Sequence, residues 1–138
     1  MTSGKVISEK DIELFIPQRP PFVFIDAIEE VNAELARTRF TVPACCPLVT
    51  DNILPLAGLV ENAAQTCAAR AGFTSGNKIG YIGAIKQVQA YRLPSVGETL
   101  TTEARLIQEV LNISLIECTT HVKDEIIATA TLKLAVMD

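Results

Sequence analysis

The sequence predicts an α+β domain in which one curved antiparallel sheet wraps around a single long helix. Two runs of residues with the period of a strand come before the helical segment and four come after it. The four later runs are joined by short connections, which favour antiparallel neighbours. The helical segment is apolar on nearly all sides, and such a helix must be surrounded by protein. The sheet is therefore expected to enclose it.

Composition favours a single domain spanning residues 1–138. Hydrophobic residues make up 49% of the 138 residues and charged ones 20%, so the chain can bury a sizeable core and keep apolar surface for a partner. The longest stretch without a charged side chain, residues 40–50, is well short of the ~20 residues that a membrane helix needs. The net charge is −4, with no cluster of basic residues. We expect neither a membrane nor a nucleic acid as a partner.

The charged N-terminal segment and the spacing of the cysteines predict a cytoplasmic protein without a metal or other cofactor. Residues 9–13 carry four charged side chains where a secretory signal needs an apolar run. The four cysteines, at positions 45, 46, 67 and 118, show no CxxC spacing, and the single His121 completes no usual zinc pattern. We expect reduced thiols, and a histidine that is exposed or structural.

The elements before the long helix are expected in the following order. A capping pattern at Ser8 and Asp11 predicts a short helix over Glu9–Phe15, which Pro17 stops. Alternating residues then predict strands over Phe22–Val31 and Leu35–Val42. In the second of these strands one face is expected to carry Ala36, Thr38, Phe40 and Val42.

The helix and the remaining strands follow a loop. Pro43–Leu54 contains two prolines and no period, whereas Pro55–Ala71 predicts a helix whose only charged residues are Glu61 and Arg70. Four strands are expected at Ile79–Arg92, Glu98–Val110, Asn112–Lys123 and Glu125–Val136. The last strand is expected to place on one face Ile126, Ala128, Ala130, Leu132, Leu134 and Val136. The two free edges of such a sheet favour a dimer.

Three segments carry a resemblance to a known family. Residues 16–26 read IPQRPPF followed by FID, similar to LPHRYPF followed by a strand and Asp; residues 59–65 read LVENAAQ, similar to LxEAMAQ; residues 86–100 are similar to KxVRFRRPVxPGDxL. The chain thus resembles the hot-dog-fold 3-hydroxyacyl-acyl-carrier-protein dehydratases of fatty acid synthesis. The resemblance implies a hot-dog fold and an acyl thioester substrate on acyl carrier protein or CoA. It also favours a homodimer, a heterodimer with a hot-dog homologue, or a higher oligomer.

Glu61 is the expected catalytic residue. An unpaired carboxylate in an apolar setting costs several kcal/mol, so a Glu within an alanine-rich helix needs a reason. The resemblance implies that Glu61 acts as the acid for the leaving hydroxyl; a solvent-facing strip, or pairing with Arg70 or a sheet residue, would explain it structurally. Gln65 lies one turn further on the same face and is expected either to orient Glu61 or to be satisfied by backbone. Free N–H groups near Leu56 and Ala57 at the helix start are expected to polarise a thioester carbonyl, and Pro55 and Leu56 are expected to contact substrate.

The loop before the helix departs from the family pattern. The resembling enzymes carry a GHFPxxPIMPG loop whose histidine serves as the base, whereas residues 44–55 contain no histidine and the matching position is Pro47. We expect Cys46 and Pro47 to contact substrate. Replacement bases are Asp51 or a thiolate from Cys45 or Cys46. A diverged branch, similar to the dehydratase-like proteins of aryl polyene pigment clusters, fits better than the housekeeping enzyme.

Three functions remain open at this stage. One is dehydration in fatty acid or polyene biosynthesis, with Glu61 and either a substitute base or a histidine from a partner chain. Another is thioester hydrolysis, with Glu61 activating water. The third is a non-catalytic subunit that binds an acyl chain or stabilises an active homologue, and the missing histidine favours it. The sequence therefore predicts a dehydratase-like protein and leaves its activity open.

Overall fold

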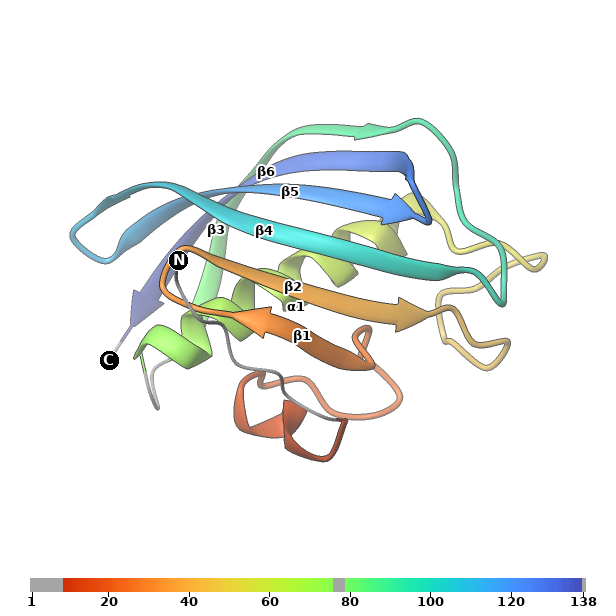
Figure 1. Ribbon diagram of the computed structural model, residues 1–138, viewed down its shortest axis with the longest axis horizontal. Coiled ribbons are helices and arrows are strands. Elements are labelled where there is room, and N and C mark those ends of the chain that lie inside the picture. The colour runs from red at the N-terminus through yellow and green to blue at the C-terminus, as the bar shows by residue number, and fades with distance from the viewer. Residues whose placement is uncertain (1–8, 76–78, 138) are drawn as a thin grey trace.

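The chain folds into one curved six-stranded antiparallel sheet around a central helix (Figure 1). The computed structural model describes residues 9–75 and 79–137. The strand order is β1-β2-β4-β5-β6-β3. The elements are η1 (Glu9–Leu14), β1 (Ala27–Val31), β2 (Leu35–Thr41), α1 (Leu56–Ser75), β3 (Ile79–Ala90), β4 (Thr99–Val110), β5 (Ile113–Val122) and β6 (Glu125–Met137). The predicted hot-dog arrangement is confirmed.

The sheet encloses α1, as its apolar sequence predicts. α1 contacts every strand of the sheet. The helix continues to Ser75, beyond the expected end at Ala71, and in its last turn the Thr74 hydroxyl lies 3.1 and 3.3 Å from the carbonyl oxygens of Arg70 and Ala71. At its start, the Pro55 carbonyl accepts the N–H groups of Gly58 and Leu59, so Pro55 is the N-cap rather than the first helical residue.

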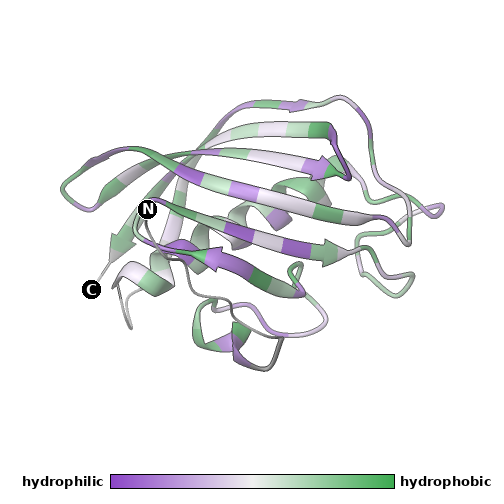
Figure 2. Ribbon diagram, in the orientation of Figure 1, coloured by the Kyte–Doolittle hydropathy of each residue, from purple (hydrophilic) through white to green (hydrophobic). Residues whose placement is uncertain are grey.

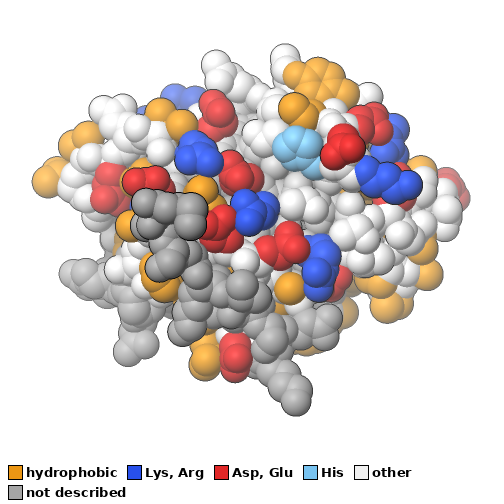
Figure 3. Space-filling model, in the orientation of Figure 1, with side chains coloured by type: hydrophobic (Ala, Val, Ile, Leu, Met, Phe, Trp, Pro, Cys, Tyr) orange, Lys and Arg blue, Asp and Glu red, His pale blue; other side chains and the backbone are white. Residues whose placement is uncertain are grey.

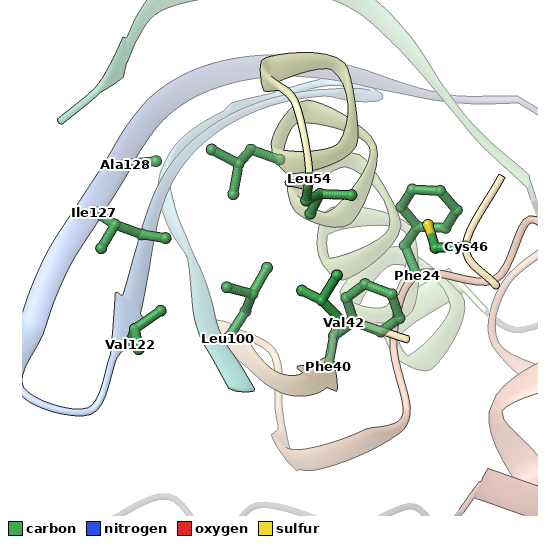
Figure 4. Packing of buried hydrophobic residues seen from close by; sticks show 10 residues of the cluster. Phe24, Phe40, Val42, Cys46, Leu54, Leu100, Val122, Ile127 and Ala128 are labelled. Carbon is green, nitrogen blue, oxygen red and sulfur yellow. The ribbon is translucent and has the colours of Figure 1, made fainter. Parts of the chain in front are cut away.

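Alternating side chains build the core between sheet and helix. Figure 2 shows hydrophobic and hydrophilic positions alternating along the strands. In β2 and the residue after it, the expected inner face of Ala36, Thr38, Phe40 and Val42 is buried. One core cluster, shown in Figure 4, contains the parallel rings of Phe24 and Phe40, whose centroids lie 5.6 Å apart.

The predicted strand over Phe22–Val31 is wrong in its first half, since β1 begins only at Ala27. The backbone of Phe24 bonds to the helix instead of to a strand. Its N–H donates to Gln65 Oε1 at 2.6 Å, and its carbonyl accepts from Asn62 Nδ2 at 2.7 Å. Side chains of α1 therefore take the place of a strand partner along this segment.

The predicted facing of β6 is wrong at its start. Ile126 is 47% exposed, while Ile127 is fully buried. His121 pairs with Ile126 and Thr120 pairs with Ala128, so Ile127 is the extra residue of a bulge. The bulge reverses the alternation before Ala128, and the expected inner face is then followed as far as Leu134.

The first helix and the two sheet edges complete the fold. The predicted N-terminal helix is a 3₁₀-helix and ends at Leu14. The carbonyl oxygen of Phe15 lies so close to Gly72 of α1 that there is no room for a Cβ atom on Gly72.

The two edge strands of the sheet differ in length, with five residues in β1 and twelve in β3. Among the described residues no helix is long and apolar enough to cross a membrane.

Candidate functional site

Glu61 lies in the second turn of α1 and is half-buried. Its Oε1 accepts a hydrogen bond of 3.0 Å from Gln65 Nε2. Arg70 is not its partner, because the Arg70 guanidinium donates to the carbonyl of Ala33 at 2.9 and 3.1 Å. The carboxylate is thus held by an uncharged amide one turn further along the helix.

Gln65 orients Glu61 and is satisfied by backbone at the same time. Its Nε2 also donates to the carbonyl of Phe22 at 2.8 Å, while its Oε1 accepts the N–H of Phe24. Because Oε1 must accept this N–H, the amide can turn only its NH₂ group towards Glu61. Both expected roles of Gln65, bonding to Glu61 and bonding to backbone, are therefore filled by the same fully buried side chain.

Asn62 is the residue that the sequence reasoning missed. It is fully buried, donates to the Phe24 carbonyl, and accepts the hydroxyl of Thr102 on β4 at 2.6 Å. Thr102 in turn lies 3.0 Å from the hydroxyl of Thr120 on β5. The available signal was an amide in a helix of alanines, at the position where the LxEAMAQ motif has Ala.

The candidate residues in the loop before α1 differ in how exposed their side chains are. Cys46 is buried in the core cluster of Figure 4, with Phe24 and Leu59. Cys45, Pro47 and Asp51 are exposed. Within the described residues, no hydrogen bond joins any of these side chains to Glu61, and buried Cys46 is a packing residue in this arrangement.

A narrow apolar cavity of about 10 Å³ lies between the first turns of α1 and the sheet. Leu56, at the helix start, contributes to its wall, as do Val60 and Ala63 in the next turn, whereas Glu61 is not among the lining residues. The rest of the lining includes Leu59, Val88, Cys118, Thr120, Ala128 and Ala130. The N-cap residue Pro55 is half-buried. The cavity is thus a small apolar space between helix and sheet, separate from the Glu61 carboxylate.

His121, the only histidine of the sequence, lies on the other face of the sheet. Its neighbours Thr120 and Val122 are buried on the inner face, so the imidazole points outwards. Figure 3 shows the histidine at the surface among acidic and basic side chains. This chain therefore places no imidazole beside Glu61.

Cys67 and Cys118 pack against each other between helix and sheet. The sulfur atoms of Cys67 on α1 and Cys118 on β5 lie 3.4 Å apart. The hydrogen bond to Cys118, followed by burial, raises the pKa of the Cys67 thiol well above its usual value. Among the described residues, no group of three or more His, Cys, Asp or Glu is placed to hold a metal ion.

Comparisons with known proteins agree with this architecture. The chain is 24% identical over 146 residues to the 3-hydroxyacyl-[acyl-carrier-protein] dehydratase FabZ of Levilactobacillus brevis, covering 95% of this chain and 94% of the relative. The dehydratase heterocomplex ApeI:P from Xenorhabdus doucetiae superposes with a TM-score of 0.84 at 15% identity, covering 92% and 91% of the two chains. A sigma28-regulated virulence protein from Campylobacter jejuni gives a TM-score of 0.72 at 20% identity, covering 91% and 84%.

Family assignment rests on nearly the whole sequence. Residues 10–138 match the family described as ApeP-like, ApeP dehydratase. This match spans η1 apart from its first residue, the helix with Glu61 and all six strands. The chain is a dehydratase-like hot-dog protein and belongs to the ApeP-like family.

Proposed function

We propose that this chain is one subunit of a heterodimeric dehydratase that removes water from 3-hydroxyacyl thioesters on acyl carrier protein. One observation carries the proposal: Glu61 is half-buried and held by Gln65, while His121 lies on the face of the sheet that points away from α1. The chain thus supplies an acid but no imidazole base. A second hot-dog chain would complete the site.

The reaction needs two proton transfers. A base removes a proton from the α-carbon, the C–O bond at the β-carbon breaks, and the leaving hydroxyl takes a proton to become water. Glu61 supplies this second proton, and a histidine of the partner chain receives the first. The cavity of about 10 Å³ beside Val60 and Ala63 is too small for an acyl chain, so the hydrocarbon end of the substrate would lie between the two subunits. Pro55 and Leu56 stand at the helix start, where N–H groups stabilise the developing enolate oxygen.

Names of similar proteins support the partner and the substrate. The neighbour from Xenorhabdus doucetiae is described as a dehydratase heterocomplex, and the relative from Levilactobacillus brevis as a dehydratase acting on 3-hydroxyacyl groups of an acyl carrier protein. The alternative is a subunit that stabilises its partner without catalytic work. The absence of a loop histidine is consistent with that role as well. Substitution of Glu61 in the assembled complex distinguishes a catalytic subunit from a non-catalytic one.

The purified chain alone is expected to dehydrate 3-hydroxyacyl-carrier-protein at least ~10²-fold more slowly than the pair, since one acid–base group is typically worth ~10²–10⁴ in rate. The pair would contain this chain and a hot-dog homologue that retains the histidine loop. Intact mass spectrometry of the carrier protein reports loss of water, hydrolysis or no reaction. Efficient turnover by the chain alone would overturn the proposal and point to Asp51 or a loop cysteine as base.

The partner is expected to pair along β3. This edge strand exposes Tyr81, Ile82 and Ile85, and its outer backbone groups have no strand beside them in the described structure. Replacing Ile82 and Ile85 together by Lys should dissociate the complex, because both positions would carry charge into the interface. Light scattering after size-exclusion chromatography measures the mass.

The matched control for this change is Ile107→Lys, on β4. Ile107 is likewise exposed but lies away from the β3 edge. This variant should keep the mass of the complex. Retention of the complex by the β3 double variant would place the interface elsewhere.

A further inference from the structure

We propose that Asn62 is a positioning residue that sets the orientation of the Glu61 carboxylate through the backbone of residues 22–24. This inference rests on the proposed role of Glu61 as the acid. Asn62 itself faces the sheet and forms no hydrogen bond with Glu61. Asn62 acts on residues 22–24, and these residues hold the Gln65 amide that bonds to Glu61.

Two amide side chains of α1 hold the Phe24 backbone from the helix side, and we call this pair the amide clamp. Gln65 Oε1 accepts the N–H of Phe24 at 2.6 Å, and Asn62 Nδ2 donates to the carbonyl of Phe24 at 2.7 Å. The Phe24 ring is buried and stacks on Phe40. Backbone and ring together fix where residues 22–24 lie along the helix.

Asn62 is itself held rigidly. Its Oδ1 accepts from Thr102 Oγ1 at 2.6 Å, and Thr102 Oγ1 lies 3.0 Å from Thr120 Oγ1. All three side chains are buried, so each hydrogen bond forms away from water, where leaving a polar group unpaired is costly. A rotation of the Asn62 amide would break bonds on both sides. The clamp therefore ties residues 22–24 to β4 and β5 through the helix.

Glu61 receives its orientation from the same segment. Gln65 Nε2 is divided between the carbonyl of Phe22 at 2.8 Å and Glu61 Oε1 at 3.0 Å. A shift of residues 22–24 away from the helix would move the Gln65 amide, and Glu61 Oε1 would lose its fixed partner. Asn62 resists this shift at Phe24, two residues from the carbonyl that Gln65 shares.

The test is Asn62→Ala, which restores the residue of the LxEAMAQ motif and removes both hydrogen bonds of the side chain. In the complex with the histidine-bearing partner chain, kcat should fall about tenfold, since displaced catalytic groups lose rate steeply, while KM stays within about twofold. Amide exchange followed by NMR should show the Phe24 N–H exchanging at least about tenfold faster relative to core amides of β5. Asn62→Asp, which replaces the donor to Phe24 by an acceptor, should act in the same direction.

Thr66→Val is the matched control. Thr66 is fully buried on the same helix and donates to the Asn62 carbonyl, and its hydroxyl lies 2.8 Å from that of Thr38, but it does not bond to residues 22–24. This variant should lose stability yet keep kcat and the relative Phe24 exchange within about twofold. An unchanged kcat in Asn62→Ala, or an equal loss of kcat in Thr66→Val, overturns the inference.

Glu61→Gln, measured in the same complex, separates this inference from the proposed function. An active Glu61→Gln complex would refute the role of Glu61 and with it the positioning role of Asn62. A Glu61→Gln complex that loses activity, together with an Asn62→Ala complex that does not, would refute the positioning role alone. The Phe24 exchange rate tests the amide clamp in both cases, because it needs no catalysis.

Discussion

Glu61→Gln should lower dehydration by the assembled complex about 10²–10⁴-fold, the usual contribution of one acid–base group. The amide has the shape of the carboxylic acid but releases no proton to the leaving hydroxyl. Its carbonyl oxygen still accepts from Gln65 Nε2, so the hydrogen bond that holds the side chain is retained. Thermal unfolding of the variant should resemble that of the natural chain, and carrier-protein mass spectrometry measures the rate.

Glu34→Gln, at an exposed position outside α1, serves as the control for loss of one negative charge and should keep the rate. A Glu61→Gln complex with full activity would identify this chain as the non-catalytic subunit. Loss of thioester hydrolysis, rather than of dehydration, would identify a thioesterase that uses Glu61.

Leu132→Ala should lower the free energy of unfolding by about 2–5 kcal/mol, because truncating a buried leucine leaves a cavity. Leu132 on β6 is fully buried in a cluster with Ala63 and Cys67 of α1 and Ile116 of β5. The small side chains of α1 bring helix and sheet close together, so neighbours have little freedom to fill the space. Urea denaturation measures the change, and equal slopes show that the unfolded states are comparable.

An exposed aliphatic residue provides the comparison for Leu132. Ile107→Ala should change the free energy of unfolding by no more than about 0.5 kcal/mol, since surface substitutions rarely do more. A cost below about 1 kcal/mol for Leu132→Ala would contradict the tight packing of β6 on α1.

The order of the elements could be predicted because the strands alternate with period two and the long helix is apolar on nearly all sides. The apolar segment after Pro55 could only be an enclosed helix, and the inner face of β2 followed from alternation alone. The wrong predictions lie where the alternation of residues does not determine the backbone partners. Phe22–Asp26 alternates like a strand but bonds to side chains of Asn62 and Gln65, and the bulge at Ile127 adds one residue to β6.

The candidate site could be predicted in part. Glu61 and Gln65 stood out because they are one turn apart in a motif, and a helix places such residues on one face. Asn62 did not stand out, because its partners Phe24 and Thr102 are distant in the sequence and come together only when the sheet closes around α1. The base could not be predicted from this chain, whose single histidine faces outwards.

The unequal sheet edges limit how many chains can join. β1 offers only five residues, interrupted by a register shift between Ile28 and Glu30, and Glu29 and Glu30 form ion pairs with arginines of β2. Short, bulged and charged edges of this kind resist strand addition. In the proposed pairing through β3, each chain would have only its β1 edge left, so growth by strand pairing would end at two chains. The same asymmetry disfavours fibril formation, which needs an edge strand with accessible backbone N–H and C=O groups on both sides of every subunit.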